Sequence, residues 1–205
     1  MAVLVGVAGG SGSGKTTLAG AVLRALGEAM AVVVPHDAYY RDLTHLSPEA
    51  RGQSNFDEPE ALDNERLIAD LRCLRAGGCV AVPAYDFASH TRRADTVTVA
   101  SRPIVIVEGI LLFAIAELRD LFDLRIFVDA SSETRLCRRI ARDVHERGRN
   151  RASVIAQYQR TTLAMHRQWV EPSRCFAHVT VSGETEVSNT TATIVARLRR
   201  LVPAK

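Results

Sequence analysis

The stretch Gly9-Gly10-Ser11-Gly12-Ser13-Gly14-Lys15-Thr16 decides the fold. It matches the pattern G-x-x-x-x-G-K-[ST] and lies between an apolar stretch, residues 2–8, and a segment of helical character, residues 15–29. Glycines let backbone N–H groups converge on phosphate oxygens, and the amino end of a helix adds a favourable field. The pattern therefore predicts a phosphate-binding P-loop between a buried strand and a helix.

Two residues of the P-loop have distinct expected roles. Lys15 should reach the β- and γ-phosphates of a nucleoside triphosphate, and the Thr16 hydroxyl should bind Mg²⁺. Apart from Lys205 at the C-terminus, Lys15 is the only lysine, so a compact point charge is found where phosphate is expected. The expected nucleotide-binding segment ends at Thr17.

Composition limits the class of protein. The chain has 205 residues, 47% hydrophobic and 24% charged, which is typical of one globular domain spanning 1–205. A net charge of +3 is too small to indicate a nucleic-acid partner. The longest apolar run, 104–116, contains Glu108 and is too short to cross a membrane. No basic segment typical of a signal peptide precedes the first strand.

The four cysteines show no C-x-x-C spacing, so neither a zinc site nor a redox motif is indicated. Scattered cysteines in apolar surroundings predict reduced core residues and a cytoplasmic protein.

Strand-like and helical segments alternate along the chain. Buried strands are predicted at 2–8, 31–35, 103–107, 124–128 and 177–181, and helices at 15–29, 62–76, 132–146, 152–170 and 186–201. This alternation predicts an α/β fold with three α/β/α layers and a mostly parallel sheet. Residues 79–87 and 91–100 both favour strand and are joined by a short polar turn, which predicts an antiparallel hairpin inserted at 79–100.

Two carboxylates follow predicted strands. Asp37 comes just after the second strand, and Glu108 ends the stretch Ile104-Val105-Ile106-Val107. Ligands of open α/β sheets bind beyond the carboxyl ends of the strands. We expect Asp37 to accept a proton from an attacking hydroxyl group and to contact Mg²⁺, and Glu108 to assist the metal opposite Thr16.

Arginines concentrate in one predicted helix and the turn after it. Arg135, Arg138, Arg139 and Arg142 share a helical face, and Arg147, Arg149 and Arg151 follow around Gly148. Such a cluster suits a lid, expected at 142–160, that closes over polyphosphate. We assign this role to Arg139, Arg142, Arg147 and Arg149 and leave the others open, because a solvated basic face paired with Asp143 and Glu146 is the alternative.

Several further motifs together resemble the uridine kinase (uridine–cytidine kinase) family, which is close to phosphoribulokinase and pantothenate kinase. The resemblance extends from Val5 to about Val181. Besides the P-loop, it depends on the motifs D-A-Y-Y (37–40), N-F-D-E-P (55–59), P-A-Y-D-F-A-S-H-T-R (83–92), E-G-I-L (108–111) and R-D-V-H-E-R-G-R (142–149).

The resemblance implies a P-loop kinase that transfers the γ-phosphoryl group of ATP or GTP, with Mg²⁺, to the 5′-hydroxyl of uridine or cytidine. Asp37 would be the base, with Lys15 and Arg142 as further catalytic residues. Ribose contacts would come from Asp57, Arg139 and Gln157. The base site would be formed by the residues Tyr40, Phe56, Tyr85, Phe87 and His90. Arg142, Arg147 and Arg149 would bind phosphate, and the chain would form a homo-oligomer, a dimer or tetramer.

The chain departs from the family pattern in its last third. Leu163-Ala164-Met165 replaces the usual Arg-Pro-Met, and Val181-Ser182-Gly183-Glu184 replaces a Pro-Arg-Gly turn that lies near the donor base in the family. Phe176-Ala177-His178 likewise replaces Tyr-Ala-Asp. The choice between ATP and GTP is therefore left open.

Alternatives to a pyrimidine nucleoside kinase remain at this stage. One is a related kinase for another small alcohol, such as a sugar phosphate or pantothenate. Another is a non-catalytic nucleotide-binding regulator, against which Asp37, Glu108 and the arginines argue. A nucleic-acid binder is disfavoured because the hairpin lacks alternating basic and aromatic residues.

Overall fold

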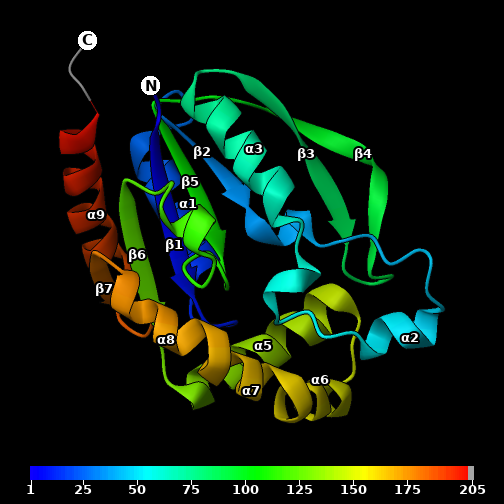
Figure 1. The fold of residues 1–205 in the computed structure, drawn as a ribbon. Helices are drawn as coiled ribbons and strands as arrows, with labels where there is room; N and C mark the ends of the chain where they lie inside the picture. Colours follow the sequence, from blue (N-terminus) through cyan, green and yellow to red (C-terminus); the bar gives the residue numbers. More distant parts are fainter. Residues whose placement is uncertain (203–205) are drawn as a thin grey trace.

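A parallel sheet forms the centre of the computed structural model, which describes residues 1–202 and so leaves Lys205 outside the described part (Figure 1). Its strand order is β2-β5-β1-β6-β7. The strands are β1 (Val3–Gly9), β2 (Ala31–Pro35), β5 (Ile104–Gly109), β6 (Leu124–Asp129) and β7 (Val179–Ser182). All neighbouring pairs in this sheet are parallel, which confirms the predicted α/β class.

Side chains of the buried strands alternate between two helical layers. Val3, Val5 and Val7 of β1 belong to the core shared with α1 (Lys15–Leu26) and α9 (Val187–Leu201). Leu4 and Ala8 face the opposite core, with α3 (Asn64–Arg75) and α4 (Ala116–Arg119). The apolar run that predicted a strand buried on both faces thus holds three layers together.

The inserted hairpin forms a second, two-stranded antiparallel sheet of β3 (Cys79–Asp86) and β4 (Thr91–Ala100). In Figure 1 it extends along α3 and away from the central sheet. Arg92 ties its tip to the loop after β2, because Nε donates to the carbonyl oxygen of Tyr40 at 2.8 Å and Nη2 contacts Asp63 at 3.1 Å. Along the chain, two 3₁₀ turns, His36–Tyr39 and Pro59–Ala61, and the short helix α2 (Pro48–Gln53) lie between β2 and α3.

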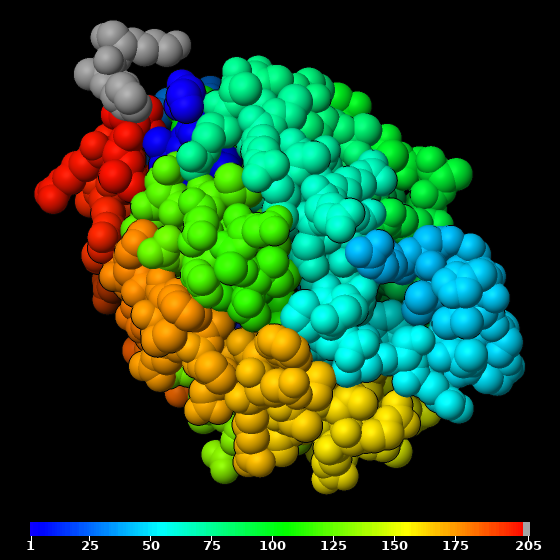
Figure 2. Space-filling view, in the orientation of Figure 1, coloured from blue at the N-terminus to red at the C-terminus, as the bar shows by residue number. Residues whose placement is uncertain are grey.

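The segment predicted as one helix over 152–170 is helical but interrupted. After α5 (Ser132–Arg147) come α6 (Arg151–Gln157), α7 (Leu163–Met165) and α8 (Glu171–Ser173). Two π-helical turns, Tyr158–Thr162 and His166–Val170, separate them, and a 3₁₀ turn, Arg174–Phe176, ends the run. Figure 2 shows this yellow-to-orange segment packed along one edge of the molecule, beside the cyan segment that carries Asp57.

The structure excludes one alternative that the sequence left open for α5, and it corrects the expectation for the cysteines. The arginine face of α5 is not a solvated surface, because Arg135 and Arg139 are each only 6% exposed. The helix turns its charged face inward and exposes Val144. All four cysteines are free thiols, but they lie at the surface and not in the core. Cys73 and Cys137, for example, lie on the outer faces of α3 and α5, so the apolar residues around them in sequence do not surround them in space.

Within residues 1–202, no helix combines the length and apolar character that a membrane span requires.

Candidate functional site

The P-loop adopts a conformation that its glycines permit. Gly9, Gly12 and Gly14 have φ angles of 151°, 82° and 99°, a region that residues with a β-carbon rarely adopt. A β-carbon on Gly12 would also lie 2.3 Å from the backbone oxygen of Arg135. The loop therefore fits closely against the start of α5, and its backbone N–H groups are available to oxyanions at the amino end of α1.

Thr16 and Glu108 meet where β1 and β5 end side by side. The Thr16 hydroxyl donates to Oε2 of Glu108 at 3.1 Å, and Glu108 pairs with Val7 in the sheet register. Burial raises the pKa of the Glu108 carboxyl, and the Lys15 ammonium opposes this rise. A hydroxyl and a carboxylate oxygen beside a phosphate-binding loop fit Mg²⁺, which prefers few protein oxygens together with phosphate and water.

Asp37 lies in the 3₁₀ turn that follows β2, and its Oδ1 is buried without a hydrogen-bond partner. The turn is fixed from behind by fully buried His36, whose Nε2 lies 2.9 Å from Oδ1 of Asn64. The amide nitrogen of Asn64 in turn donates to the carbonyl oxygen of Pro59 at 2.8 Å. Asn64 thus connects the turn carrying Asp37 to the segment carrying Asp57.

One cavity brings together residues from six parts of the chain that are distant in sequence. About 50 Å³ of space remains free between their side chains. Its lining consists of Ser11, Lys15, Asp37, Tyr40, Phe56, Asp57, Tyr85, Phe87, His90, Ile110, Arg139, Arg142, Arg147, Arg149 and Gln157. Fourteen of these are residues that the sequence singled out for nucleotide or nucleoside contact; Ile110 is the addition.

Aromatic rings form one end of this cavity. Tyr40 makes edge contacts with Phe56 and Phe87 at centroid distances of 5.7 and 6.4 Å. His90 stacks on Phe56 at 4.5 Å, with the rings 20° from parallel. Burial lowers the pKa of His90, and the hydroxyl of Tyr85 is buried without a partner. A flat aromatic ligand with polar edges suits this end, provided that the stacked rings separate to admit it.

Polar groups form the middle of the cavity. The Asp57 carboxylate accepts a hydrogen bond from the Thr162 hydroxyl at 2.8 Å and lies 3.9 Å from Nη1 of Arg139. The amide oxygen of Gln157 accepts from Arg139 at 3.1 Å and from Arg149 at 2.6 Å. These groups are suited to sugar hydroxyls, and Thr162 belongs to a π-helical turn, a feature often found at functional sites.

Four arginines converge on the carboxylate of Asp143. Arg142, Arg147 and Arg149 approach it at 2.9, 3.5 and 3.4 Å, and Arg139 at 3.8 Å. The Asp143 side chain is completely buried. The sequence left open whether Asp143 neutralises these arginines on the surface; instead it holds them around the cavity. The guanidinium of Arg147 also lies 4.3 Å above the Phe87 ring, which joins the 142–160 region to the hairpin.

Comparison with known proteins agrees with this geometry. A sequence model described as "Phosphoribulokinase / Uridine kinase family" matches residues 4–189. The chain belongs to this family. A uridine kinase of Chloroflexus aurantiacus is 42% identical over 202 residues, covering 98% of this chain and 97% of that protein. One of Chloroflexus aggregans is 45% identical, covering 88% and 87%.

A solved structure shows the same fold at lower sequence identity. The phosphoribulokinase from Rhodobacter spheroides superposes with a TM-score of 0.64 at 16% identity, covering 93% of this chain and 74% of that one. This likeness shows the fold, and the family membership together with the relatives named above makes the chain an enzyme, a P-loop kinase.

A second cavity of this kinase, about 270 Å³, lies on the other side of the P-loop. Gly14, Thr17 and Arg138 line it together with Ser182, which belongs to the segment that departs from the family pattern, and Thr185, which follows that segment. A β-carbon on Gly183 would lie 1.8 Å from the carbonyl oxygen of Ser13, so that segment touches the P-loop directly. Glu184 is tied down as well, because its Oε1 accepts a hydrogen bond from the Ser131 hydroxyl at 2.6 Å.

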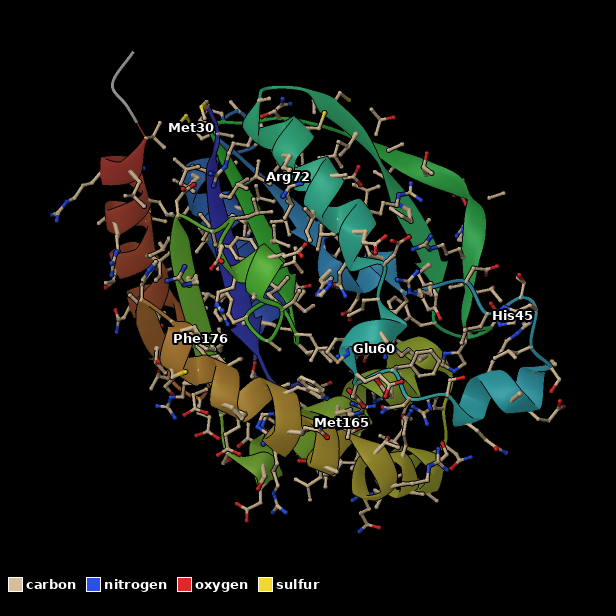
Figure 3. The ribbon with its side chains drawn as sticks, viewed as in Figure 1. Met30, His45, Glu60, Arg72, Met165 and Phe176 are labelled. Carbon is tan, nitrogen blue, oxygen red and sulfur yellow. The ribbon has the colours of Figure 1, made fainter. Side chains whose placement is uncertain are left out.

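The other departures lie outside both cavities of the kinase. His178 binds Arg125 through Nε2 at 2.9 Å, and Phe176 lies under Arg119, whose guanidinium is 3.8 Å from the ring centroid. Phe176, labelled in Figure 3, lies at the end of the helical run, next to β6 and β7. These residues hold the helical run against the sheet.

Sequence reasoning missed several residues that shape the site. Ile110 lies in the motif E-G-I-L, but an apolar residue after a strand gave no sign that it lines a cavity. Asn64 and Thr162 act through hydrogen bonds across 28 and 105 residues, which no local pattern reveals. Arg92 was part of a recognised motif, and its anchoring bonds are visible only in the fold.

Proposed function

We propose that this kinase transfers the γ-phosphoryl group of ATP or GTP to the 5′-hydroxyl of uridine or cytidine, giving UMP or CMP. The observation that carries this proposal is the unpartnered Oδ1 of Asp37, buried beside Lys15 in a cavity whose far end is aromatic. A carboxylate oxygen without a partner is suited to accept a hydroxyl proton. The names of the relatives support the nucleoside as acceptor.

In the proposed reaction the nucleoside O5′ attacks the γ-phosphorus, and the bond from that phosphorus to the β,γ-bridging oxygen breaks. Asp37 takes the hydroxyl proton. Lys15 and the arginines held by Asp143 stabilise negative charge on the transferred group, with Arg142 nearest the P-loop because its Nη2 lies 3.4 Å from the Ser11 hydroxyl. Thr16, Asp37 and Glu108 would supply oxygen ligands for Mg²⁺, which would neutralise phosphate charge when bound.

Substrate selection is assigned to the inserted hairpin. The unpartnered Tyr85 hydroxyl and the neutral His90 ring can hydrogen-bond a pyrimidine edge, and an analogue lacking that edge would leave them unpaired. Asp57, Arg139 and Gln157 are the proposed ribose partners. Residues 142–160 are the proposed lid, and 79–100 the nucleoside-binding lobe of a single domain. The cavity of Thr17, Arg138 and Thr185 is the proposed donor-base site.

The proposal is tested with a coupled assay that offers uridine, cytidine, other nucleosides, small sugars and pantothenate with ATP or GTP. Pyrimidine ribonucleosides should be phosphorylated with much higher kcat/KM than the other acceptors. Asp37→Asn should lower kcat by about a hundredfold or more while uridine still binds. Preference for a non-nucleoside alcohol, or full turnover in Asp37→Asn, would overturn the proposal.

We also propose a cytoplasmic homo-oligomer in which α5 packs on α5 of a second copy. Its exposed side carries Leu136, Cys137, Ile140 and Val144. Glu133 lies at one end of this strip, and His145 and Arg151 at the other. An antiparallel two-fold contact would therefore place opposite charges together over an apolar centre.

This contact can be tested by oxidation. A variant with serine at positions 73, 79 and 175 retains only Cys137, and a two-fold contact should give a disulfide-linked dimer at low micromolar protein. Ile140→Lys should convert the protein to monomers in analytical ultracentrifugation. A monomeric wild-type chain without cross-linking contradicts this contact.

A further inference from the structure

A third cavity, about 520 Å³, lies behind the P-loop, beside the first turns of α5 and before the part of that helix that lines the nucleoside cavity. It is enclosed by the end of β6, the first half of α5 and the helical run after residue 157. Its floor is formed by Phe127, Arg135, Tyr158 and His166. None of these four lines the nucleoside cavity or the donor-base cavity, so the site described above does not account for them.

Arg135 is a buried cation without a counter-charge. It is 6% exposed, and no carboxylate of residues 1–202 lies within 4.0 Å of its guanidinium. Its one hydrogen bond runs from Nε to the carbonyl oxygen of Ala130 at 3.2 Å. The arginines further along α5 and in the turn after it share Asp143, whereas Arg135 has no such partner. A buried charge is strongly unfavourable unless it is paired, so a ligand is the missing partner.

Neighbouring groups on the floor are also unpartnered. Tyr158 is 5% exposed, and its hydroxyl has no hydrogen-bond partner. Burial, with a further contribution from Arg135, lowers the pKa of His166 to about 4, so this imidazole is neutral at pH 7. The floor therefore offers a guanidinium, a phenolic O–H and a neutral ring nitrogen beside the apolar Phe127 ring.

The rim narrows the choice of ligand. Glu133, Glu171 and Arg167 are exposed there, and Asp129 binds Arg174 at 2.8 Å. The two free carboxylates outweigh the single free guanidinium, so the entrance disfavours a polyanion, whereas a small anion of low charge can reach Arg135. We propose that this cavity binds a small oxyanion, a carboxylate or a phosphate group, through Arg135 and Tyr158.

The cavity is in contact with the P-loop. A β-carbon on Gly10 would lie 2.7 Å from Nη1 of Arg135 and 3.0 Å from Cε1 of His166. An anion bound to Arg135 would offset a positive charge directly behind the loop that holds the nucleotide phosphates. Occupancy of the cavity therefore weakens nucleotide binding, and bound nucleotide weakens anion binding by the same factor.

The test separates this cavity from the P-loop, which also binds phosphate. The full chain is saturated with Mg²⁺ and a non-hydrolysable ATP analogue and is titrated with inorganic phosphate or benzoate by calorimetry. At least one probe should bind, and Arg135→Gln should weaken it tenfold or more. Tyr158→Phe should weaken it a few-fold, and Arg72→Gln, an exposed arginine on α3 labelled in Figure 3, should leave it unchanged.

Benzoate binding without phosphate binding identifies a carboxylate site with an apolar body, and the reverse identifies a phosphate site. Either result supports the proposal when Arg135→Gln or Tyr158→Phe weakens or abolishes binding of that probe. Tyr158→Phe keeps the test valid if Arg135→Gln fails to fold, because it removes only an unpartnered hydroxyl. Absence of binding by both probes, with and without the nucleotide analogue, overturns the proposal. So does binding to both Tyr158→Phe and Arg135→Gln that equals binding to the wild-type chain. None of these outcomes depends on which nucleoside the kinase phosphorylates.

Discussion

The carboxylate of Asp143 lies 2.9 Å from Nη2 of Arg142, and its side chain has no exposed surface. This one acid also faces Arg139, Arg147 and Arg149. Arginines that would otherwise repel each other are thereby held on the inner side of α5 and in the turn after it. Their positions around the cavity depend on an acid that contacts no substrate in the proposed reaction.

Asp143→Asn should therefore damage both folding and catalysis. Four guanidinium groups would lose their common counter-charge, and removing one partner of a buried ion pair costs about 3 kcal/mol or more. We expect a lower denaturation midpoint in urea and a kcat reduced by at least tenfold. Glu146→Gln, which removes an exposed acid of the same helix, is the matched control. Equal stability of the two variants would contradict the role of Asp143.

Thr162→Val tests the bond between the lid region and Asp57. The substitution keeps the side-chain shape but removes the hydroxyl that donates to Asp57 at 2.8 Å. A buried hydrogen bond of this kind contributes about 1 kcal/mol, and its loss leaves the Asp57 carboxylate less well oriented. KM for uridine should rise several-fold, with a smaller effect on KM for ATP. Thr161→Val, on the neighbouring residue, should change neither constant.

Arg92→Gln tests how the hairpin is anchored. The variant loses the bonds to the Tyr40 carbonyl and Asp63, so Tyr85 and His90 should be less well positioned. We expect a higher KM for the nucleoside and a smaller difference between uridine and purine nucleosides in kcat/KM. Arg93→Gln removes a cation whose side chain is 62% exposed and serves as the control. Unchanged selectivity in Arg92→Gln would contradict this anchoring.

Asn64→Ala should act mainly on kcat. The substitution leaves the buried Nε2 of His36 without its partner and releases the turn that carries Asp37. An unsatisfied buried donor costs about 1–3 kcal/mol of stability. Isothermal titration should show near-normal uridine binding while kcat falls severalfold. Weaker binding with unchanged kcat would indicate that Asn64 supports Asp57 and not Asp37.

Stability should decrease as pH falls below 6.5, because the pKa of half-buried His166 is lowered to about 4 in the folded protein. Between these pH values the unfolded chain binds a proton at this site and the folded chain does not, so stability is lost on acidification. His166→Gln should reduce the loss of urea resistance between pH 7 and pH 5. An identical pH profile in the variant would assign the effect to the other histidines whose pKa is lowered, which are buried His36, half-buried His90 and exposed His178.

The sequence by itself determined the layers and the phosphate loop. Apolar strands such as 104–107 and the glycines of the P-loop are local signals, because burial on both faces and left-handed backbone depend on neighbouring residues. The family motifs also indicated which residues to look for, and fourteen of them line one cavity. Periodicity placed the arginines of α5 on one face but left open which of them are buried, since a solvated basic face has the same pattern.

Only the tertiary structure decided which charges are paired. Asp143 is buried because four arginines from two segments converge on it, and Arg135 is left without a counter-charge because it lies about two helical turns before that acid on α5. The contacts of Thr162 with Asp57 and of Asn64 with His36 join segments far apart in the chain. Hydrogen bonds and ion pairs depend on distances of a few ångströms in space, and sequence separation carries no information about such distances.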